Sequence, residues 1–232
     1  MKKNTNQKAI IVYGPPGSGK GTQAELLERG FDFIHFDTGR YLEMLYKSSK
    51  AKKDKILKKE KKLFDEGFLN TPSFVLDIVG RATKKIAHSG FSIVYSGSPR
   101  TFYEAFGDKK KQGLIHILVK EFGKKNIHVV WLKIKKETSS KRNSKRLICS
   151  ICGLPIMASH YKIKKCAFCG GGFRTRTLDN PKIIKIRLEE YKNSTYPIIK
   201  KMKQLKFSIV EVNGEHPPYK VSQEIIKKLK LL

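Results

Sequence analysis

A glycine-rich segment near the start of the chain constrains its fold more than any other feature. The sequence GPPGSGKGT, residues 14–22, follows a short apolar run at residues 9–13 and precedes a stretch of helical composition. The spacing Gly-x-x-x-x-Gly-Lys between a strand and a helix is typical of a phosphate-binding loop. Glycines allow successive backbone N–H groups to face one anion, and the helix N-terminus adds partial positive charge. We therefore expect a phosphate group at this turn.

The residue types in this segment predict which groups contact the phosphates. Lys20 is placed to reach the outer phosphates of a nucleotide. The next position usually holds a Ser or Thr that contacts Mg²⁺, but here it is Gly21, and Thr22 follows. The residues expected to bind the phosphates are Gly17, Ser18, Gly19, Lys20, Gly21 and Thr22.

Apolar runs alternate with helical patterns along most of the chain. Strands are expected at residues 10–13, 33–36, 91–97, 127–134 and 207–212, and helices at 40–65, 74–87, 114–125, 183–205 and 221–232. Mostly apolar strands that alternate with helices indicate a parallel sheet covered on both faces. We expect an α/β fold of the P-loop NTPase type, with a three-layer αβα core built on a parallel sheet.

The net charge of +29 is extreme for a chain of 232 residues. Such an excess attracts polyanions, including nucleic acid. However, only nine of the 49 basic residues are arginines, and the lysines are scattered from end to end. This distribution favours a solvated coat of lysines, so a nucleic-acid partner is an alternative that the composition does not favour.

The apolar runs are too short for a membrane-bound or secreted protein. None approaches the roughly 20 apolar residues of a membrane span. The basic N-terminal sequence MKKNTNQK is followed by an apolar run of only five residues, which is too short for a secretory signal. We expect a cytoplasmic protein with no membrane partner.

Four cysteines form two Cys-x-x-Cys pairs, separated by thirteen residues, within a polar, glycine-rich segment at about residues 138–181. In a cytosolic chain this spacing indicates a metal site. Four thiolates around zinc leave no open position, so the site would be structural, with iron as the alternative metal. A zinc ribbon that binds nucleic acid would not account for the phosphate-binding loop. The expected ligands are Cys149, Cys152, Cys166 and Cys169.

The form GPPGSGKGTQ is narrower than a general phosphate loop and resembles the adenylate kinase family of nucleoside monophosphate kinases. Further motifs of that family follow in order over nearly the whole chain. The acceptor-site motif is matched by DTGRYLE at 37–43, the next motif by GFLN at 67–70, and the following one by SGSPRT at 96–101. Arg142 and Arg146 show the family's four-residue spacing, and Arg176 and Arg187 its eleven-residue spacing.

This resemblance implies a set of functional residues. Catalytic roles fall to Lys20, Arg100, Arg146, Arg176 and Arg187, and ATP binding also to Arg142. The acceptor would contact Thr38, Gly39, Arg40, Phe68, Leu69, Asn70, Gly97, Arg100, Glu104, Arg176 and Arg187. Thr38 is also the expected N-cap of its helix. The resemblance further implies one kinase core over residues 1–232, with an acceptor-binding insert at 38–71 and a zinc-bearing lid at 142–180.

The chain departs from the family pattern at several positions near the expected site. Glu43 stands where the family has an arginine and Arg40 where it has an aspartate, so Arg40 would supply the cation that Glu43 does not. Glu104 replaces the glutamine that reads adenine, and two acceptor oxygens suit guanine better. Ser96 replaces an aspartate linked to Mg²⁺. Leu178 replaces the first aspartate of a pair and leaves Asp179.

The function implied by the resemblance is transfer of the γ-phosphoryl group of ATP to AMP, giving two ADP, with Mg²⁺ as cofactor and structural Zn²⁺. No nucleophile or general base from the protein is expected, because phosphoryl transfer depends on positioning and charge neutralisation. One alternative is the same reaction with a shifted acceptor such as GMP. Another is a weakly active nucleotide- or RNA-binding protein of the same fold. The resemblance also suggests a monomer.

Overall fold

The computed structural model describes residues 7–157 and 163–231. Its centre is a five-stranded sheet in the order β2-β3-β1-β4-β8, in which every neighbouring pair is parallel. The strands are β1 (Ala9–Tyr13), β2 (Phe33–Phe36), β3 (Ser92–Tyr95), β4 (Ile127–Lys133) and β8 (Ser208–Asn213). All five residues of β1 are buried, which agrees with an apolar strand that is covered on both faces. The α/β fold expected from the sequence is confirmed.

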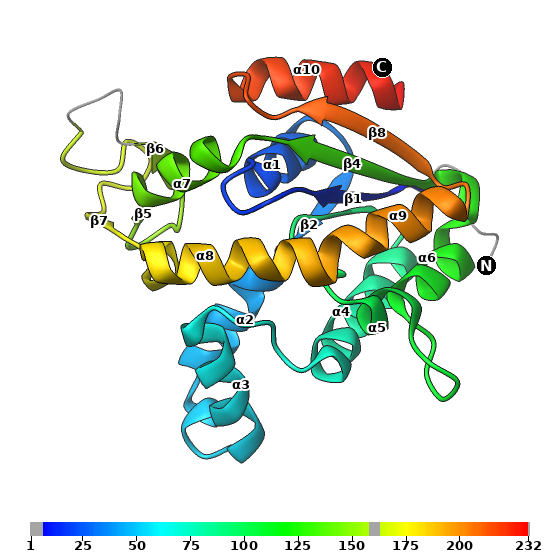
Figure 1. Ribbon diagram of the computed structural model, residues 1–232, viewed down its shortest axis with the longest axis horizontal. Coiled ribbons are helices and arrows are strands. Elements are labelled where there is room, and N and C mark those ends of the chain that lie inside the picture. Colours follow the sequence, from blue (N-terminus) through cyan, green and yellow to red (C-terminus); the bar gives the residue numbers. More distant parts are fainter. Residues whose placement is uncertain (1–6, 158–162, 232) are drawn as a thin grey trace.

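Helices cover both faces of this sheet (Figure 1). Ile10 and Val12 of β1 pack toward one face, whereas Ile11 packs toward the other, because successive side chains of a strand point in opposite directions. The first face is covered by α1 (Lys20–Gly30) and α10 (Pro218–Leu229). The second is covered by α4 (Pro72–His88), α5 (Phe102–Phe106), α6 (Leu114–Phe122) and α9 (Tyr196–Gln204), with η2 (Lys124–Asn126) leading into β4.

A helical segment projects from the core between β2 and α4 (Figure 1). It consists of α2 (Thr38–Lys47), η1 (Ser49–Lys52) and α3 (Lys55–Glu66). Leu42, Tyr46 and Leu57 form a small apolar cluster of its own, which also contacts Ile78 of α4. The segment is therefore stabilised by its own packing and by contacts with Phe36, Phe74 and Ile78 of the core.

The expected N-cap of α2 is wrong by one residue. Asp37 is the cap, and its Oδ1 accepts the backbone N–H of Arg40 at 3.1 Å. Thr38 is the first helical residue, and its hydroxyl donates instead to Oγ of Ser98 at 2.9 Å. That bond ties the start of α2 to the loop after β3.

The cysteine-bearing segment forms a second, three-stranded antiparallel sheet in the order β6-β5-β7, which lies at one end of the molecule (Figure 1). We call it the cysteine sheet. Its strands are β5 (Arg146–Cys149), β6 (Pro155–Met157) and β7 (Phe173–Arg174). It is joined to the core by α7 (Lys136–Ser144) on one side and by η3 (Thr177–Asp179) and α8 (Pro181–Glu190) on the other.

The helix expected over residues 183–205 is interrupted. After α8 comes a π-helical turn, η4 (Tyr191–Thr195), and then α9. Pro197 lies in the first turn of α9 and lacks the N–H that an uninterrupted α-helix would need there. In the turn, the Thr195 hydroxyl donates to the carbonyl oxygen of Arg100 at 2.9 Å. The interruption thus holds the loop that carries Arg100.

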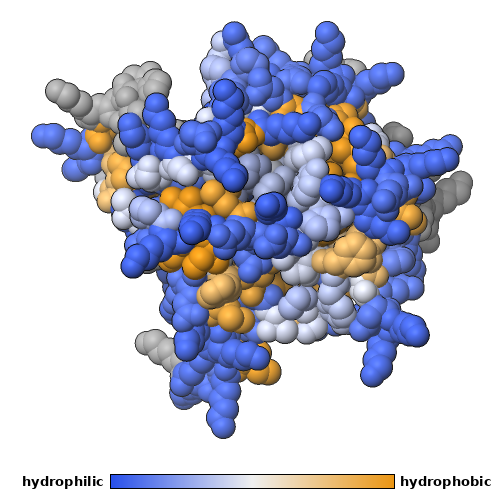
Figure 2. Space-filling view, in the orientation of Figure 1, coloured by the Kyte–Doolittle hydropathy of each residue, from blue (hydrophilic) through white to orange (hydrophobic). Residues whose placement is uncertain are grey.

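Hydrophilic side chains cover most of the face seen in Figure 2, in agreement with the high lysine content. Among the helices of the described ranges, none combines the length and apolar character that a membrane span requires.

Candidate active site

The loop between β1 and α1 has a backbone conformation suited to anion binding. Gly17 and Gly19 have φ values of +75° and +92°, in the left-handed region that glycine tolerates. A Cβ on Gly17 would also come within 2.7 Å of the Asn143 amide nitrogen and 3.0 Å of the Ser139 carbonyl oxygen. Only glycine therefore fits there, and the loop can wrap one anion at the N-terminus of α1.

Lys20 is the first residue of α1 and folds back over the loop. Its Nζ donates to the carbonyl oxygens of Gly14 and Pro15, both at 2.9 Å. Burial, and then the charges of Arg100 and Arg187, hold the pKa of Lys20 well below its ordinary value. The ammonium group thus lies among other cations, where a negatively charged ligand would stabilise its charged form.

A cleft of about 1150 Å³ opens above this loop. It lies at the carboxyl edge of the parallel sheet, where ligands bind in open α/β folds. Every residue expected to bind ATP or the acceptor lines this one cleft, so the fold brings together groups from residue 17 to residue 187. The loop after β8 lines it as well, at Gly214, Glu215 and His216, and sequence reasoning missed this loop because it carries no recognised motif.

Arginines converge on the phosphate end of the cleft. Arg146 donates from Nε to Oδ2 of Asp179 at 2.8 Å, and Arg187 donates from Nη1 to the Leu178 carbonyl oxygen at 3.2 Å. Burial, and then the neighbouring arginine charges, lower the pKa values of Arg176 and Arg187. So many cations with few counter-charges define a site for a polyanion.

Arg142 lies on α7 and donates to backbone carbonyl groups rather than to a carboxylate. Its guanidinium donates to the carbonyl oxygens of Gly214 at 2.8 Å and Glu215 at 3.2 Å. It also lies 3.5 Å from the carbonyl oxygen of Gly17. Arg142 therefore joins the phosphate loop, α7 and the loop after β8 on one side of the cleft.

Asn70 and Arg100, both expected to contact the acceptor, are bonded to protein groups. The buried Asn70 amide donates to the carbonyl oxygen of Glu60 at 2.7 Å and to its Oε2 at 2.9 Å. Arg100 donates from Nε to the Gly97 carbonyl oxygen at 2.7 Å. Asn70 thus ties the segment after α3 to Glu60 within that helix, while the bond from Arg100 fixes its guanidinium plane beside Gly97.

Glu104 is buried at the wall of the cleft, with 3% of its surface exposed. Its carboxylate accepts the Arg100 backbone N–H at 2.8 Å and the Thr101 hydroxyl at 3.2 Å, and the Thr101 hydroxyl accepts the Glu104 N–H at 3.1 Å. The Thr101 hydroxyl thus caps α5 as in a capping box, and the sequence TFYE at 101–104 carries the signature of that motif. The Glu104 carboxylate, however, accepts the N–H of Arg100 rather than that of Thr101. Burial raises the pKa of Glu104 to about 7.

Glu43 and Arg40 both face the cysteine sheet from α2. Glu43 accepts from Lys47 at 2.8 Å and from Arg174 of β7 at 3.0 Å. The Arg40 guanidinium lies close to Gly153, where an added Cβ would come within 3.9 Å of its Cζ. Sequence reasoning missed Arg174, because its partner is 131 residues away in the chain.

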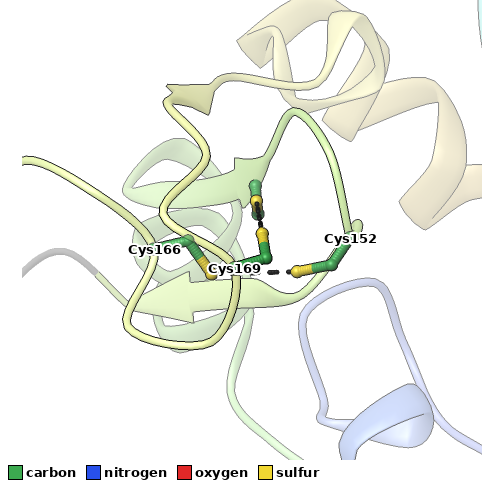
Figure 3. Close-up of side chains that lie close together, drawn as sticks. Cys152, Cys166 and Cys169 are labelled. Atoms are coloured by element: carbon green, nitrogen blue, oxygen red, sulfur yellow. Dashed lines mark hydrogen bonds between the residues drawn. The ribbon is translucent and has the colours of Figure 1, made fainter.

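The four cysteines come together as a cluster at the tip of the cysteine sheet (Figure 3). Their Sγ atoms all lie within 4.8 Å of one another, with Cys149 and Cys169 at 3.4 Å and Cys152 and Cys166 at 3.7 Å. Four thiolates so close together repel unless a cation neutralises them, and their number and softness fit a closed tetrahedral zinc site. The cluster can therefore bind a metal ion.

These features define a class of protein. A glycine-rich loop over a helix N-terminus, set under a ring of arginines at the carboxyl edge of a parallel sheet, belongs to P-loop proteins that bind nucleoside phosphates and transfer phosphoryl groups. Comparison with known proteins narrows this class. The family model described as adenylate kinase matches residues 12–206. The chain belongs to the adenylate kinase family, and it is an ATP-dependent phosphotransferase that acts on nucleoside monophosphates.

Curated relatives named adenylate kinase match nearly the whole chain. The one from Caldicellulosiruptor bescii is 32% identical over 95% of this chain and 98% of its own length. The one from Buchnera aphidicola subsp. Cinara cedri is 34% identical over 94% of both chains. The one from Geobacter sulfurreducens is 32% identical over 94% of this chain and 96% of its own length.

Proposed function

We propose that the acceptor is AMP, so that the reaction is ATP + AMP to two ADP with Mg²⁺. The observation that carries this proposal is the single cleft in which Lys20 and the arginines meet. At about 1150 Å³ it exceeds the space that one drug-sized ligand needs. Two nucleotides placed end to end would bring their phosphates under the same cations.

The residues divide into two groups by their position around the cleft. ATP would bind with its phosphates on the loop from Gly17 to Thr22 and its base side toward Arg142. The acceptor would bind between α2 and the loop after β3, with its phosphate on Arg100. Arg146, Arg176 and Arg187 lie between the two and would neutralise the transferring group.

In the step itself, an oxygen of the acceptor phosphate bonds to the γ-phosphorus as the bond to the β–γ bridging oxygen breaks. The electron pair and the negative charge pass to the departing ADP. Lys20 and the arginines would bind this charge as it moves, and they would hold the two oxygens in line. No protein group needs to gain or lose a proton.

Two segments would close over the substrates. We propose residues 38–71 as the acceptor-binding insert and 142–180 as a lid, both attached to the core that makes up the rest of residues 1–232. Both segments line the cleft, and closure would exclude water, so that the γ-phosphoryl group reaches the acceptor rather than water. Zinc bound by the four cysteines would hold the lid rigid.

Mg²⁺ fits the donors present at the phosphate end. Mg²⁺ prefers oxygen ligands, and this part of the cleft offers the Asp37 carboxylate and the Thr22 hydroxyl. When bound with ATP, Mg²⁺ neutralises phosphate charge.

Glu104 decides between AMP and GMP. When protonated, its carboxyl group carries one donor and one acceptor, like the amide of glutamine, and can pair with adenine. When ionised, it has acceptors only and suits guanine. Because burial raises its pKa to about 7, the protonated form is well populated at neutral pH, which favours AMP.

An assay of ADP release with Mg-ATP against AMP, GMP, CMP, UMP and dTMP tests this proposal, with a control that lacks acceptor. We expect AMP to give the highest kcat/KM. A higher value for GMP would move the acceptor to guanine. No turnover with any acceptor, from folded and metal-loaded protein, would favour the binding-protein alternative, and RNA titrations at two salt concentrations would then test that alternative.

A further inference from the structure

Asp37 and Ser96 are the first residues after two neighbouring strands, β2 and β3, which end side by side in the sheet. Phe36 of β2 pairs with Tyr95 of β3 in parallel register, so the residue after each strand emerges beside the other at the carboxyl edge. Just beyond these residues, the hydrogen bond from the Thr38 hydroxyl to the Ser98 hydroxyl joins the segments that follow the two strands. Asp37 and Ser96 both line the cleft, as does Lys20.

The positions that commonly hold Mg²⁺ in P-loop proteins lack their usual side chains here. These are a hydroxyl directly after the loop lysine and a carboxylate at the end of a neighbouring strand. Gly21 occupies the first position and Ser96 the second. In addition, the Ser96 hydroxyl lies 2.8 Å from Nε2 of His35 and is engaged there.

Three other carboxylates that line the cleft or lie beside it are already bound to protein groups. Asp179 accepts from Arg146, and Glu43 accepts from Lys47 and Arg174. Glu104 is buried, and its carboxylate accepts the backbone N–H of Arg100, just before the helix that carries Glu104. Asp179 and Glu43 are thus paired with cations and Glu104 is buried, so a metal at any of the three would compete with these contacts.

Asp37 differs from these carboxylates. As N-cap of α2 it accepts the Arg40 N–H through Oδ1, and a carboxylate has acceptor capacity for further bonds. Its negative charge raises the pKa values of Lys20 and Arg176, against the lowering by burial and the other cations. Asp37 thus lies close enough to the phosphate end of the cleft for its charge to act there.

We propose that Asp37 is the carboxylate that holds the hydrated Mg²⁺ of bound ATP, one strand away from the position where P-loop proteins commonly carry it. This inference rests on the proposed function, because the metal would enter with ATP. It assigns a metal-binding role to a side chain that also caps a helix, so the test must separate the two roles.

The test measures the affinity for a non-hydrolysable ATP analogue by calorimetry, with Mg²⁺ and with a chelator, and takes the ratio of the two dissociation constants. Wild type should bind more tightly with Mg²⁺. In Asp37→Asn the ratio should fall by about 10- to 100-fold, as for lost partners of bound metals. Asn caps a helix as well as Asp does, so the melting temperature should stay close to that of wild type.

Two further variants make the result specific. Adding Ser96→Asp to Asp37→Asn returns a carboxylate to the neighbouring strand and should restore the ratio. Glu25→Gln removes another acidic side chain that lines the cleft and should leave the ratio unchanged. An unchanged ratio in Asp37→Asn, with the analogue still bound, would overturn the role of Asp37 alone. Failure of wild type to bind the analogue would overturn the proposed function and this inference together.

Discussion

Glu43 of α2 accepts a hydrogen bond from Arg174 of β7 at 3.0 Å, across 131 residues of sequence. The bond links the helical segment to the cysteine sheet, the two parts proposed to close over the substrates. Burial opposes ionisation of Glu43, but the bonds from Lys47 and Arg174 prevail and lower its pKa below the ordinary value. Glu43 is therefore ionised at neutral pH, and its bond with Arg174 can hold the two parts together.

Removing this link should change substrate binding more than stability. The Arg174 and Glu43 side chains are 41% and 26% exposed, so the pair is worth at most about 1 kcal/mol. Arg174→Ala should raise the KM for the acceptor by up to about five-fold, which corresponds to that energy. Lys47→Ala is the matched control, since it removes the other partner of Glu43 within the same helix. Equal KM values in the two variants would contradict a link between the segments.

Lys20→Ala should lower turnover without unfolding the protein. The side chain bonds to two loop carbonyls, but its charge faces the position proposed for the transferring group. Loss of one such charge should reduce kcat on the order of 10²- to 10³-fold. Lys84→Ala, an exposed lysine on α4, should behave like wild type. Near-normal turnover in Lys20→Ala, with an unchanged circular dichroism spectrum, would disprove the role.

The identity of the acceptor should depend on pH through Glu104. Raising the pH from about 6 to about 8 ionises a carboxyl group with a pKa near 7, so the ratio of kcat/KM for AMP to that for GMP should fall. Glu104→Gln cannot ionise and should keep a nearly constant ratio. A wild-type ratio that does not change with pH, measured beside this control, would exclude Glu104 as the group that reads the base.

The same carboxyl group should make stability depend on pH. Its pKa is about 7 when folded, against an ordinary value of 4.5, so the folded state binds more protons in this window. Stability is therefore lost as the pH rises from about 5 to about 8, by on the order of 3 kcal/mol for this group. Urea titrations of wild type and Glu104→Gln should show that, as the pH rises, the free energy of unfolding of the glutamine variant increases relative to that of wild type. A difference that is constant with pH would contradict the raised pKa.

Metal removal should act on the cysteine sheet first. Cys166→Ser should lose the bound metal and lower the melting temperature, because four thiolates that share one ion bind it as a unit. The parallel sheet has its own apolar core, so nucleotide binding on the phosphate loop should weaken rather than disappear. Elemental analysis should find one zinc per wild-type chain. Metal-free wild-type protein with unchanged melting would rule out a structural metal.

Much of the fold follows from local patterns. The phosphate loop, the five strands and the parallel character of their sheet are indicated by glycine positions, apolar runs and strand–helix alternation, and these patterns are visible in the sequence. The convergence of Arg100, Arg146 and Arg187 follows once those elements are placed, because loops at the carboxyl edge of a sheet meet there.

Features that depend on contacts between distant segments could not be predicted. The partner of Glu43 lies on another sheet, and the Thr38 hydroxyl donates to Ser98 of another loop, while Asp37 caps α2. Two local signals are also present in the sequence: Pro197 marks the interruption before α9, and TFYE at 101–104 places Glu104 in the first turn of α5.

Transfer of labelled phosphate tests the central claim most directly. The protein is mixed with ATP labelled at the γ-phosphate, unlabelled AMP and Mg²⁺, and the products are separated after a single turnover. We predict that the label appears in the β-phosphate of ADP formed from AMP, and that Lys20→Ala shows far less. Label found only as inorganic phosphate, or retained in ATP, would contradict phosphoryl transfer to AMP in this cleft.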